Sequence, residues 1–409
     1  MATSTAIAGA KASARVVSRR PRVLVVGGED HALRIPFLIE LRRRGFTVSA
    51  AGTGDPELFL ESGIPYFTYR FDRFIDPLAD WRAIARLTEI ISVARADLVQ
   101  AFDTKPDILV PLAARRAGGP AVVRTINGLG WVFSSESILA RLLRPVHDAL
   151  FRRTARATTL TVFQNRRDMA HFERGGMIGP GRAALIPGSG VDPNRFAESL
   201  AAQPSREQLR ATFGLGEEEI VITVSRLSRM KGISHLLEAA ALVHAVRPGV
   251  RFFLVGSRET EGRLAIDPSE IARHASYVQA IGQRSDIPAL LAMADVFAFP
   301  SELQEGVPRV VLEAALAGLP VVTTDMPGCA DVIEPDVGGI VVPPRSPRLL
   351  ADAILTLLRE PERARVMAAH ARNRVTREFS LEKIVDQYAG FYFELAGCSR
   401  PDFALSGAL

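Results

Sequence analysis

Two carboxylates near the C-terminal end of the chain are spaced in a way that suits a ligand with an anionic group and hydroxyls. Glu305 precedes a Gly-Val-Pro turn, and Glu313 follows eight positions later, on a helix predicted over 308–317. Pro308 suits the first turn of that helix, where a missing N–H is no loss. The free N–H groups at a helix start bind anions. This run therefore fits a sugar nucleotide, whose diphosphate lies between hydroxyl-rich sugars.

Two cations form a second candidate segment. Arg226 and Lys231 bracket the turn that follows a strand predicted at 219–224. Arginine offers a planar fork to phosphate oxygens, and lysine offers a point charge. Taken alone, these side chains fit solvated cations in a loop better than they fit a ligand site. Together with the Glu305 run, they favour a ligand site.

The length and the cysteine content limit the possible architectures. A chain of 409 residues exceeds the usual size of one hydrophobic core, so two domains are expected. Cys329 and Cys398 give neither a disulfide framework nor a metal-ligand spacing, which favours a reducing, cytoplasmic compartment. Cys329 is interpreted as a plain loop residue. The scattered His31, His235 and His274 indicate no metal site.

Positive charge is concentrated in the first half of the chain. Residues 1–200 hold 28 Lys and Arg against 19 Asp and Glu, whereas residues 201–409 hold 22 against 26. A basic half suggests an anionic partner, such as a phosphate-bearing acceptor or a membrane surface. Nucleic acid is not expected, because the chain has no recognised binding motif and no interleaving of basic and aromatic residues.

The sequence contains no apolar run near the roughly 20 residues that span a bilayer. Residues 1–20 contain no acid and no long apolar core. We interpret them as a disordered basic tail, with a transit peptide as the alternative.

Short apolar strands alternate with helices in both halves of the chain. Such alternation predicts parallel sheets in two doubly wound, Rossmann-like α/β domains, with ligands in the cleft between them. The strands are predicted at 21–26, 47–51, 97–101 and 121–125, and then at 219–224, 251–255, 278–281, 296–299 and 320–323.

The domain boundary is expected in the loop-like stretch 192–207, so the first domain is taken as 21–195 and the second as 196–380. The last segment, 381–409, begins with a helix predicted over 381–396. This helix is long enough to cross back to the first domain.

The two paired motifs, Arg226 to Lys231-Gly232 and Glu305-x7-Glu313, resemble those of the retaining glycosyltransferases of the large family 4, which have the GT-B fold. The resemblance covers nearly everything from 21 to 396. Within it, 125–133 resembles the subgroup that builds capsular, exopolysaccharide and O-antigen repeat units. The other matching segments are 185–196, 253–256 and 281–284.

The resemblance implies a role for each matching side chain. Arg226 and Lys231 would hold the donor diphosphate and stabilise the departing charge. Glu305 would bind hydroxyls of the donor sugar, and Glu313 those of the ribose. Stabilisation by fixed cations and a helix N-terminus needs no metal, and the chain has no Asp-x-Asp motif, so no metal or other cofactor is expected.

Further donor contacts are implied for glycine-rich loops. The amides of Gly306 and Val307 would face the sugar and the phosphate. Gly27 and Gly28 would let the first-domain loop approach the diphosphate, although a tight strand-to-helix turn explains them equally well. The resemblance also places three residues near the nucleotide, namely Gly256, Gln283 and Arg284.

Two positions depart from the family pattern. Many relatives have His where Asn127 and Phe102 stand. Asn127 can donate and accept hydrogen bonds but cannot titrate, so it suits either a donor contact or a turn. Asp103 and Lys105 are candidates for acceptor binding, with solvated loop charges as the alternative.

A basic amphipathic stretch over 138–153 has apolar residues at helical spacing with arginines between them. Such a stretch fits an anionic membrane surface, and it equally fits a helix that covers the core, with Pro145 kinking or restarting it.

We therefore expect a retaining glycosyltransferase that moves a sugar from a nucleoside diphosphate, UDP in the first place, to a polyprenyl-diphosphate-linked sugar. The alternatives are a sugar-nucleotide epimerase or phosphorylase of the same fold, and an inactive subunit that binds nucleotide. The expected location is the cytoplasm, or the inner face of its membrane.

Overall fold

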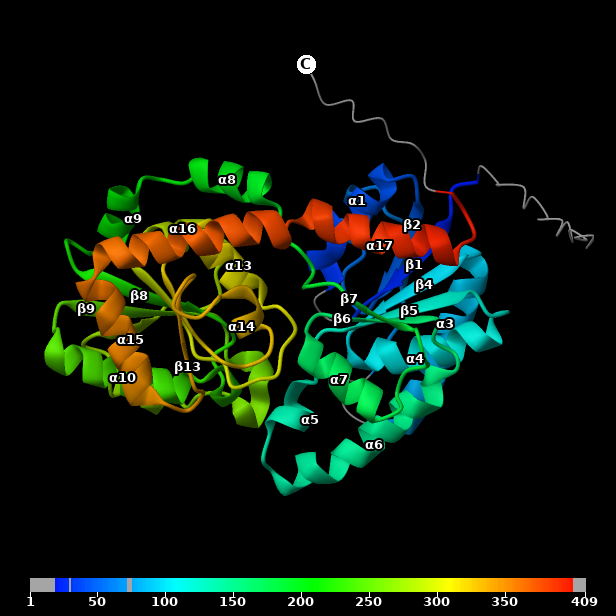
Figure 1. The fold of residues 1–409 in the computed structure, drawn as a ribbon, viewed down its shortest axis with the longest axis horizontal. Helices are drawn as coiled ribbons and strands as arrows, with labels where there is room; N and C mark the ends of the chain where they lie inside the picture. The colour runs from blue at the N-terminus through cyan, green and yellow to red at the C-terminus, as the bar shows by residue number, and fades with distance from the viewer. Residues whose placement is uncertain (1–18, 29–30, 72–75, 400–409) are drawn as a thin grey trace, which may run out of the picture.

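The structure is a computed structural model that describes residues 19–28, 31–71 and 76–399. The expectation of a disordered tail falls on residues 1–18, which lie outside the described residues. Figure 1 shows two α/β lobes side by side, one built from the first half of the chain and one from the second.

The first lobe is built on a seven-stranded parallel sheet of order β3-β2-β1-β4-β5-β6-β7. Its strands are β1 (Arg22–Val26), β2 (Thr47–Gly52), β3 (Tyr66–Thr68), β4 (Leu98–Phe102), β5 (Ala121–Ile126), β6 (Leu160–Phe163) and β7 (Ala183–Leu185). The helices between them are α1 (Ile35–Arg43), α2 (Glu57–Glu61), α3 (Pro77–Ala94), α4 (Thr104–Arg116), α5 (Gly130–Ser134), α6 (Ile138–Ala155) and α7 (Arg166–Arg174), with a 3₁₀ turn at His31–Arg34.

The second lobe has a six-stranded parallel sheet of order β10-β9-β8-β11-β12-β13. Its strands are β8 (Glu219–Val224), β9 (Val250–Val255), β10 (Val278–Ala280), β11 (Val296–Phe299), β12 (Val321–Thr324) and β13 (Ile340–Val342). Its helices are α8 (Pro193–Ala201), α9 (Arg206–Thr212), α10 (Ile233–Val246), α11 (Pro268–Ala272), α12 (Ile287–Ala292), α13 (Arg309–Leu316), α14 (Cys329–Val332), α15 (Pro347–Arg359) and α16 (Pro361–Glu378). One-turn 3₁₀ segments lie at Arg229–Lys231 and Glu259–Leu264.

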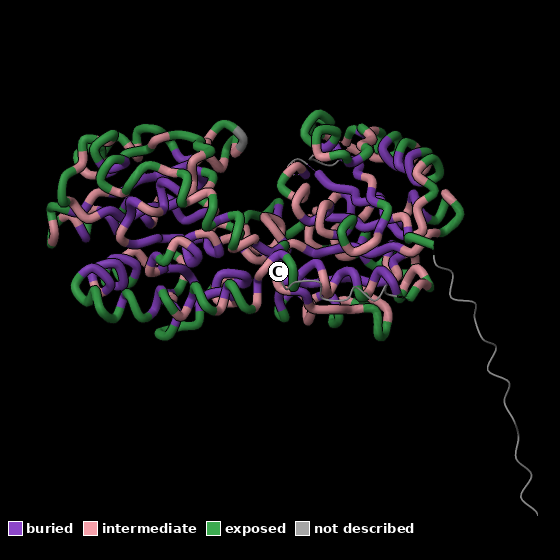
Figure 2. Tube along the Cα trace, turned by 90° about the horizontal axis from the view of Figure 1, so that it is seen from above, coloured by how far each residue is buried: buried purple, intermediate pink, exposed green. Residues whose placement is uncertain are grey.

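Alternate residues of each central strand face opposite layers of helices, as a period of two requires. In β1, Val23 and Val25 pack with α1, whereas Leu24 and Val26 pack with α3 and α4. In β8, Ile222 faces the cluster that contains α13, and Val221 faces α10 and α15. Buried residues accordingly form a separate hydrophobic core in each lobe (Figure 2). The two lobes meet at a narrower waist.

The last helix, α17 (Leu381–Leu395), lies on the first lobe although it follows the second lobe in the sequence (Figure 1). The Tyr392 hydroxyl donates to Gln100 Oε1 at 2.7 Å, and the Tyr388 hydroxyl lies 3.0 Å from Thr125 Oγ1. The chain crosses twice at the waist, where Leu381 N donates to Val191 O at 2.8 Å. These contacts join α17 to strands β4 and β5 of the first sheet.

Two local expectations need correction. Cys329 is not a plain loop residue, because it begins α14 and is fully buried in the core of the second lobe. Burial raises the pKa of its thiol to about 12, and the nearby Glu305 carboxylate adds to that rise. Pro145 neither interrupts nor restarts its helix, since α6 runs from Ile138 to Ala155 without a break. Among the described residues, no helix combines the length and the apolar character needed to cross a bilayer.

Candidate functional site

The two predicted motifs meet at the carboxyl ends of neighbouring strands of the second sheet, β8 and β11. Lys231 Nζ donates to Glu305 Oε1 at 2.6 Å, and Ser301 Oγ donates to the same oxygen at 2.7 Å. The side chains of Lys231 and Glu305 are 9% and 17% exposed, so water screens their ion pair only weakly. This pair is the central feature of the candidate site.

Gly232 allows the two loops to approach each other. Its φ is +71°, and a Cβ added there would lie 1.9 Å from the carbonyl oxygen of Pro300. A residue with a side chain would therefore clash with the backbone from which the Glu305 run begins. The glycine after Lys231 is thus explained by close packing as well as by the turn.

The other predicted charged residues already have ion-pair partners. Arg226 pairs with Glu261 from the 3₁₀ segment Glu259–Leu264. Arg309 Nε donates to Glu313 Oε1 at 2.8 Å, one turn along α13. Arg284 pairs with Asp286 at 2.6 Å. In each of these ion pairs the arginine side chain is roughly half-exposed, so a ligand phosphate or hydroxyl can still compete for the charged groups.

The Gly306 and Val307 amides, which were expected to face a donor, form hydrogen bonds with the first lobe in this structure. Gly306 N donates to the carbonyl of Asn127 at 2.7 Å, and Val307 N donates to Gln164 Oε1 at 2.9 Å. Pro308 directly precedes α13 rather than lying within its first turn. The loop before α13 is therefore fastened to the first lobe by hydrogen bonds.

Asn127 connects these contacts to other residues of the first lobe. Its side chain donates to Asp103 Oδ1 at 3.0 Å and accepts from Gln164 Nε2 at 2.9 Å. Gly28 N in turn donates to Asp103 Oδ2 at 3.0 Å. The structure thus links Gly28, Asp103, Asn127 and the Gly306 loop in one hydrogen-bonded series.

The remaining predicted residues lie outside this series. Lys105 pairs with Asp80 on α3. Gly27 packs against His31, whose ring nitrogen would lie 1.8 Å from an added Cβ. Gly256 packs against Ser225, the residue next to Arg226, and its amide donates to Gly282 O at 2.8 Å. Gln283 is exposed at the neighbouring loop.

Sequence reasoning missed Gln164 and Asn165. Both follow β6, at the same sheet edge as Asn127, and Asn165 Nδ2 lies 3.4 Å from the Glu305 carbonyl oxygen. The sequence signal that could have identified them is the apolar run 160–163, because two residues with side-chain amides follow it directly. Asn165 also caps α7 through Asp168 N, and burial raises the pKa of the Asp168 carboxyl to about 6.

A small cavity of about 200 Å³ lies behind the Asn127 loop. Its walls include Asp103, Gly128, His147 and the fully buried Asp107. Burial raises the pKa of Asp107 well above its ordinary value, and it lowers the pKa of His147. Within the described residues, no group of three or more His, Cys, Asp or Glu side chains is arranged to hold a metal ion.

Comparisons with known proteins agree on the class of this site. Residues 37–195 match the model of Glycosyltransferase Family 4, and residues 205–374 match that of Glycosyl transferases group 1. The chain is 30% identical over 317 residues to a GDP-mannose-dependent alpha-(1-6)-phosphatidylinositol monomannoside mannosyltransferase of Mycobacterium tuberculosis, covering 75% of this chain and 78% of that one.

Two further similarities cover most of the chain. It is 26% identical over 333 residues to the UDP-Gal:alpha-D-GlcNAc-diphosphoundecaprenol alpha-1,3-galactosyltransferase of Escherichia coli, covering 81% of this chain and 84% of that one. Its fold is similar to that of Anabaena HepE in complex with UDP and glucose, with a TM-score of 0.74, 21% identity and coverage of 92% and 100%.

Proposed function

Because this chain is a glycosyltransferase of family 4 with the GT-B fold, we propose that it transfers a sugar from a nucleoside diphosphate, with retention of configuration, to a polyprenyl-diphosphate-linked sugar. The observation that carries the proposal is the Lys231–Glu305 contact of 2.6 Å, made beside the Asn127 loop of the first lobe. In this contact, a cation that can bind a diphosphate lies next to a carboxylate that can bind sugar hydroxyls.

The chemistry of each group fits this reaction. A lysine ammonium has three N–H donors, so Lys231 can keep Glu305 and still donate to phosphate oxygens. Arg226, whose side chain is 43% exposed, can turn from Glu261 to the diphosphate. Fixed positive charge that meets the charge of a leaving phosphate lowers the barrier, by about 3 kcal/mol for one good donor.

The proposed step needs no nucleophile from the protein. The bond between the sugar C1 and the phosphate oxygen breaks, and a bond from C1 to the acceptor oxygen forms on the same face. The proton of the acceptor hydroxyl goes to the departing phosphate. We propose that this step is independent of metal, so an excess of chelator should leave the rate unchanged.

The names of the relatives support the substrate classes. The Escherichia coli relative acts on a diphosphoundecaprenol-linked sugar with UDP-Gal, and a Campylobacter jejuni relative, 24% identical over 369 residues, is also named for a diphospho-undecaprenol acceptor. The Mycobacterium tuberculosis relative instead uses GDP-mannose and a phosphatidylinositol mannoside. Its 30% identity makes this second pair of substrates the alternative to include in any assay.

An acceptor of this kind lies in a membrane, so we propose that the enzyme works at the inner face of the cytoplasmic membrane. Helix α6 is suited to that surface, since it exposes Ile138, Leu139, Leu142 and Val146 beside arginines. Flotation of the protein with anionic but not neutral vesicles would support this location.

The decisive experiment is a transfer assay with a panel of UDP- and GDP-sugars against lipid-diphosphate and phosphatidylinositol-linked acceptors, followed by determination of the product linkage. Arg226→Ala and Glu305→Ala should each abolish transfer while circular dichroism shows an intact fold. Arg229→Ala is the matched control, because Arg229 lies in the same loop and also pairs with a carboxylate, that of Glu270.

Full transfer by both the Arg226 and Glu305 variants would refute the assignment. Binding of UDP with no turnover across the whole panel would favour an inactive subunit. Conversion of a sugar nucleotide without any acceptor would favour an epimerase.

A further inference from the structure

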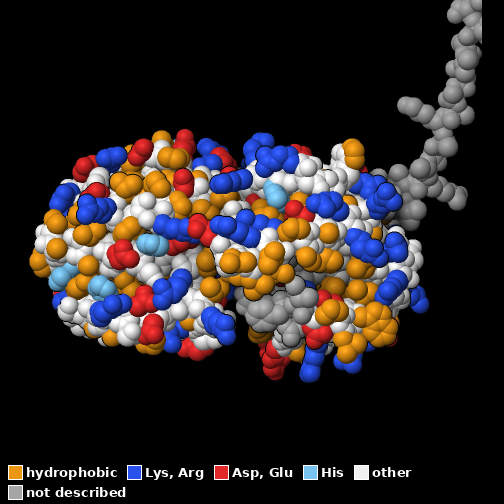
Figure 3. Space-filling model, turned by 90° about the horizontal axis from the view of Figure 1, so that it is seen from below, with side chains coloured by type: hydrophobic (Ala, Val, Ile, Leu, Met, Phe, Trp, Pro, Cys, Tyr) orange, Lys and Arg blue, Asp and Glu red, His pale blue; other side chains and the backbone are white. Residues whose placement is uncertain are grey.

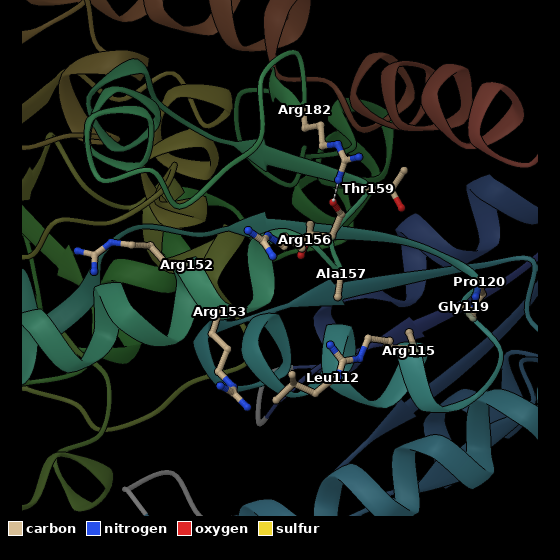
Figure 4. A pocket seen from close by; sticks show the side chains of 12 residues that line it. Leu112, Arg115, Gly119, Pro120, Arg152, Arg153, Arg156, Ala157, Thr159 and Arg182 are labelled. Carbon is tan, nitrogen blue, oxygen red and sulfur yellow. Dashed lines mark hydrogen bonds between the residues drawn. The ribbon is translucent and has the colours of Figure 1, made fainter.

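A hollow of about 800 Å³ opens at the amino-terminal edge of the first sheet (Figure 4). Its walls come from the end of α4, the loop before β5, the end of α6, the segment that leads into β6, and the residue before β7. The carboxyl end of β5 leads to Asn127, so the hollow and the Glu305 site lie at opposite edges of the sheet. A strand of this length separates them by roughly 20 Å. One ligand phosphate therefore cannot occupy both places.

Arginine dominates the lining of this hollow. Five arginines contribute, and the lining contains no Asp or Glu. They are Arg115, Arg152, Arg153, Arg156 and Arg182. Figure 4 shows that they come from α4, α6, the segment after α6 and the residue before β7, and that their guanidinium groups are spread around the hollow.

Within the described part of the chain, none of these five arginines forms an ion pair. Arg152 donates to the carbonyl of Gly175 at 2.9 Å, and Arg182 donates to that of Thr158 at 3.1 Å. The guanidinium groups of the other three form no hydrogen bond with any described residue. The cations around the Glu305 site are different, because each has a carboxylate partner. Like charges gathered without counter-charges repel one another, and a bound anion removes that cost.

The donors that remain in the hollow suit phosphate. Backbone amides at its edge are already used, since Thr159 N donates to Val122 O and Gly119 N donates to Ala114 O. The Thr159 hydroxyl accepts from Val122 N at 3.0 Å, which leaves its own proton for another acceptor. Guanidinium forks match the spacing of phosphate oxygens. The lining has no aromatic side chain on which a base would stack, which argues against single-stranded nucleic acid.

We propose that this arginine hollow is a second anion site, which binds the phosphate group of a phosphomonoester or diphosphate compound. The proposal does not depend on glycosyl transfer, because no residue of the hollow belongs to the Glu305 site. Two sources of the phosphate are chemically equivalent at the hollow itself: a free phosphate compound, and the headgroup of an anionic lipid.

The adjoining surface of α6 is what distinguishes those two sources. The exposed residues Leu142, Val146 and Leu150 form a stripe at helical spacing, and Arg153 continues the same stripe into the hollow. On the face shown in Figure 3, hydrophobic side chains form a band on the first lobe, and Lys and Arg side chains gather toward its outer end. A lipid would engage both the stripe and the hollow, whereas a free phosphate compound would engage the hollow alone.

The test compares two double variants of the full chain, both made in a Lys231→Ala background that removes the main cation of the Glu305 site. One variant carries Arg115→Gln and Arg156→Gln in the hollow. The matched control carries Arg348→Gln and Arg372→Gln, which change two exposed arginines of the second lobe that pair with no described residue. Calorimetric titration with inorganic pyrophosphate measures the affinity for a free phosphate compound. Flotation with phosphatidylcholine vesicles, with and without phosphatidic acid, measures binding to a lipid headgroup.

We expect the hollow variant to bind pyrophosphate at least about tenfold more weakly than the control, since two charge-assisted contacts are lost. Loss of pyrophosphate binding alone identifies a free phosphate compound as the ligand. An additional loss of flotation on phosphatidic acid vesicles identifies a lipid headgroup. Equal binding of both probes by the two variants would overturn the proposal. With Lys231 intact, the hollow variant should keep its rate of transfer to a water-soluble acceptor, which separates this test from that of the proposed function.

Discussion

Lys231 Nζ lies 2.6 Å from Glu305 Oε1, and the two residues approach from the ends of adjacent strands of the second sheet. The same glutamate oxygen accepts from Ser301, and the lysine ammonium also lies 5.4 Å from the centre of the Phe299 ring. Both partners are largely buried, so each depends on the other for compensation of its charge. A donor diphosphate would meet a cation whose position is already fixed by its own carboxylate.

The first prediction separates the stability of this pair from its role in transfer. Lys231→Met keeps the aliphatic stem but leaves Glu305 with Ser301 as its remaining partner. We expect transfer to fall by roughly 10²–10³-fold and the free energy of unfolding to fall by about 3 kcal/mol. The measurements are kcat/KM and chemical denaturation.

The double variant Lys231→Met/Glu305→Gln serves as the internal test. It removes both charges, so it should recover most of the stability but none of the activity. Lys383→Met is the control, at an exposed lysine that donates to the Arg377 carbonyl and has no carboxylate partner among the described residues. Recovery of activity in the double variant would show that the pair acts only through the fold.

A second prediction concerns Asn127 and Asp103. Asn127→Asp keeps the acceptor for Gln164 but replaces the donor to Asp103 with a second carboxylate about 3 Å away. Two carboxylates at that distance cannot both ionise cheaply, so the variant should lose about 1–3 kcal/mol at neutral pH and less in acid. Transfer should fall as well, because repulsion at the side chain would displace the Asn127 backbone, whose carbonyl accepts from Gly306 N.

Thermal unfolding followed across pH checks this expectation. Asn373→Asp, at an exposed position of α16, is the matched control and should change little. A loss of stability that does not vary with pH would contradict repulsion between Asp103 and the new carboxylate.

The sequence predicts best the residues whose position follows from the local pattern of apolar and polar residues. Strands 219–224 and 296–299 match β8 and β11, because buried strands of parallel sheets read as continuous apolar runs. Parallel strands bring their carboxyl ends to one edge, which is why Lys231 and Glu305 meet. The GT-B fold followed from the same alternation and from the resemblance of the paired motifs.

The contacts that sequence did not predict are those that depend on packing between distant segments. The amides of Gly306 and Val307 look free in a local view of a helix start, but the first lobe supplies acceptors for both. The partner of Arg226 is Glu261, which is 35 positions away and has no periodic relation to it. Such pairings are decided by how loops and lobes pack, and no spacing rule along one chain predicts them.

A third prediction tests the close approach at Gly232. Gly232→Ala would place a Cβ 1.9 Å from Pro300 O at a φ of +71°, so both sterics and backbone conformation oppose it. We expect a loss of about 2–4 kcal/mol of stability and a larger loss of transfer, because Lys231 and the Glu305 run would be pushed apart.

Gly249→Ala provides the comparison. It lies in open space with no atom within 4 Å of an added Cβ, and its φ is not in the left-handed region. Its stability and activity should match those of the wild type. If the two alanine variants behaved alike, close packing at Gly232 would not explain the glycine.

The last prediction concerns Asp168, where burial raises the pKa to about 6 against the action of the Asn165 hydrogen bond. The unfolded carboxyl has its ordinary pKa of 3.8, so between about pH 4 and pH 6 the folded state binds more protons than the unfolded state. Stability therefore falls as pH rises through this window, and the full cost of ionising Asp168 is present above pH 6.

Asp168→Asn removes that cost while keeping an oxygen that can accept from Asn165. The variant should gain up to about 3 kcal/mol over the wild type near pH 8 and nothing near pH 4. Urea denaturation at both pH values measures the difference, with Asp352→Asn on the exposed face of α15 as the control. A gain of equal size at both pH values would mean that Asp168 acts through packing rather than through its charge.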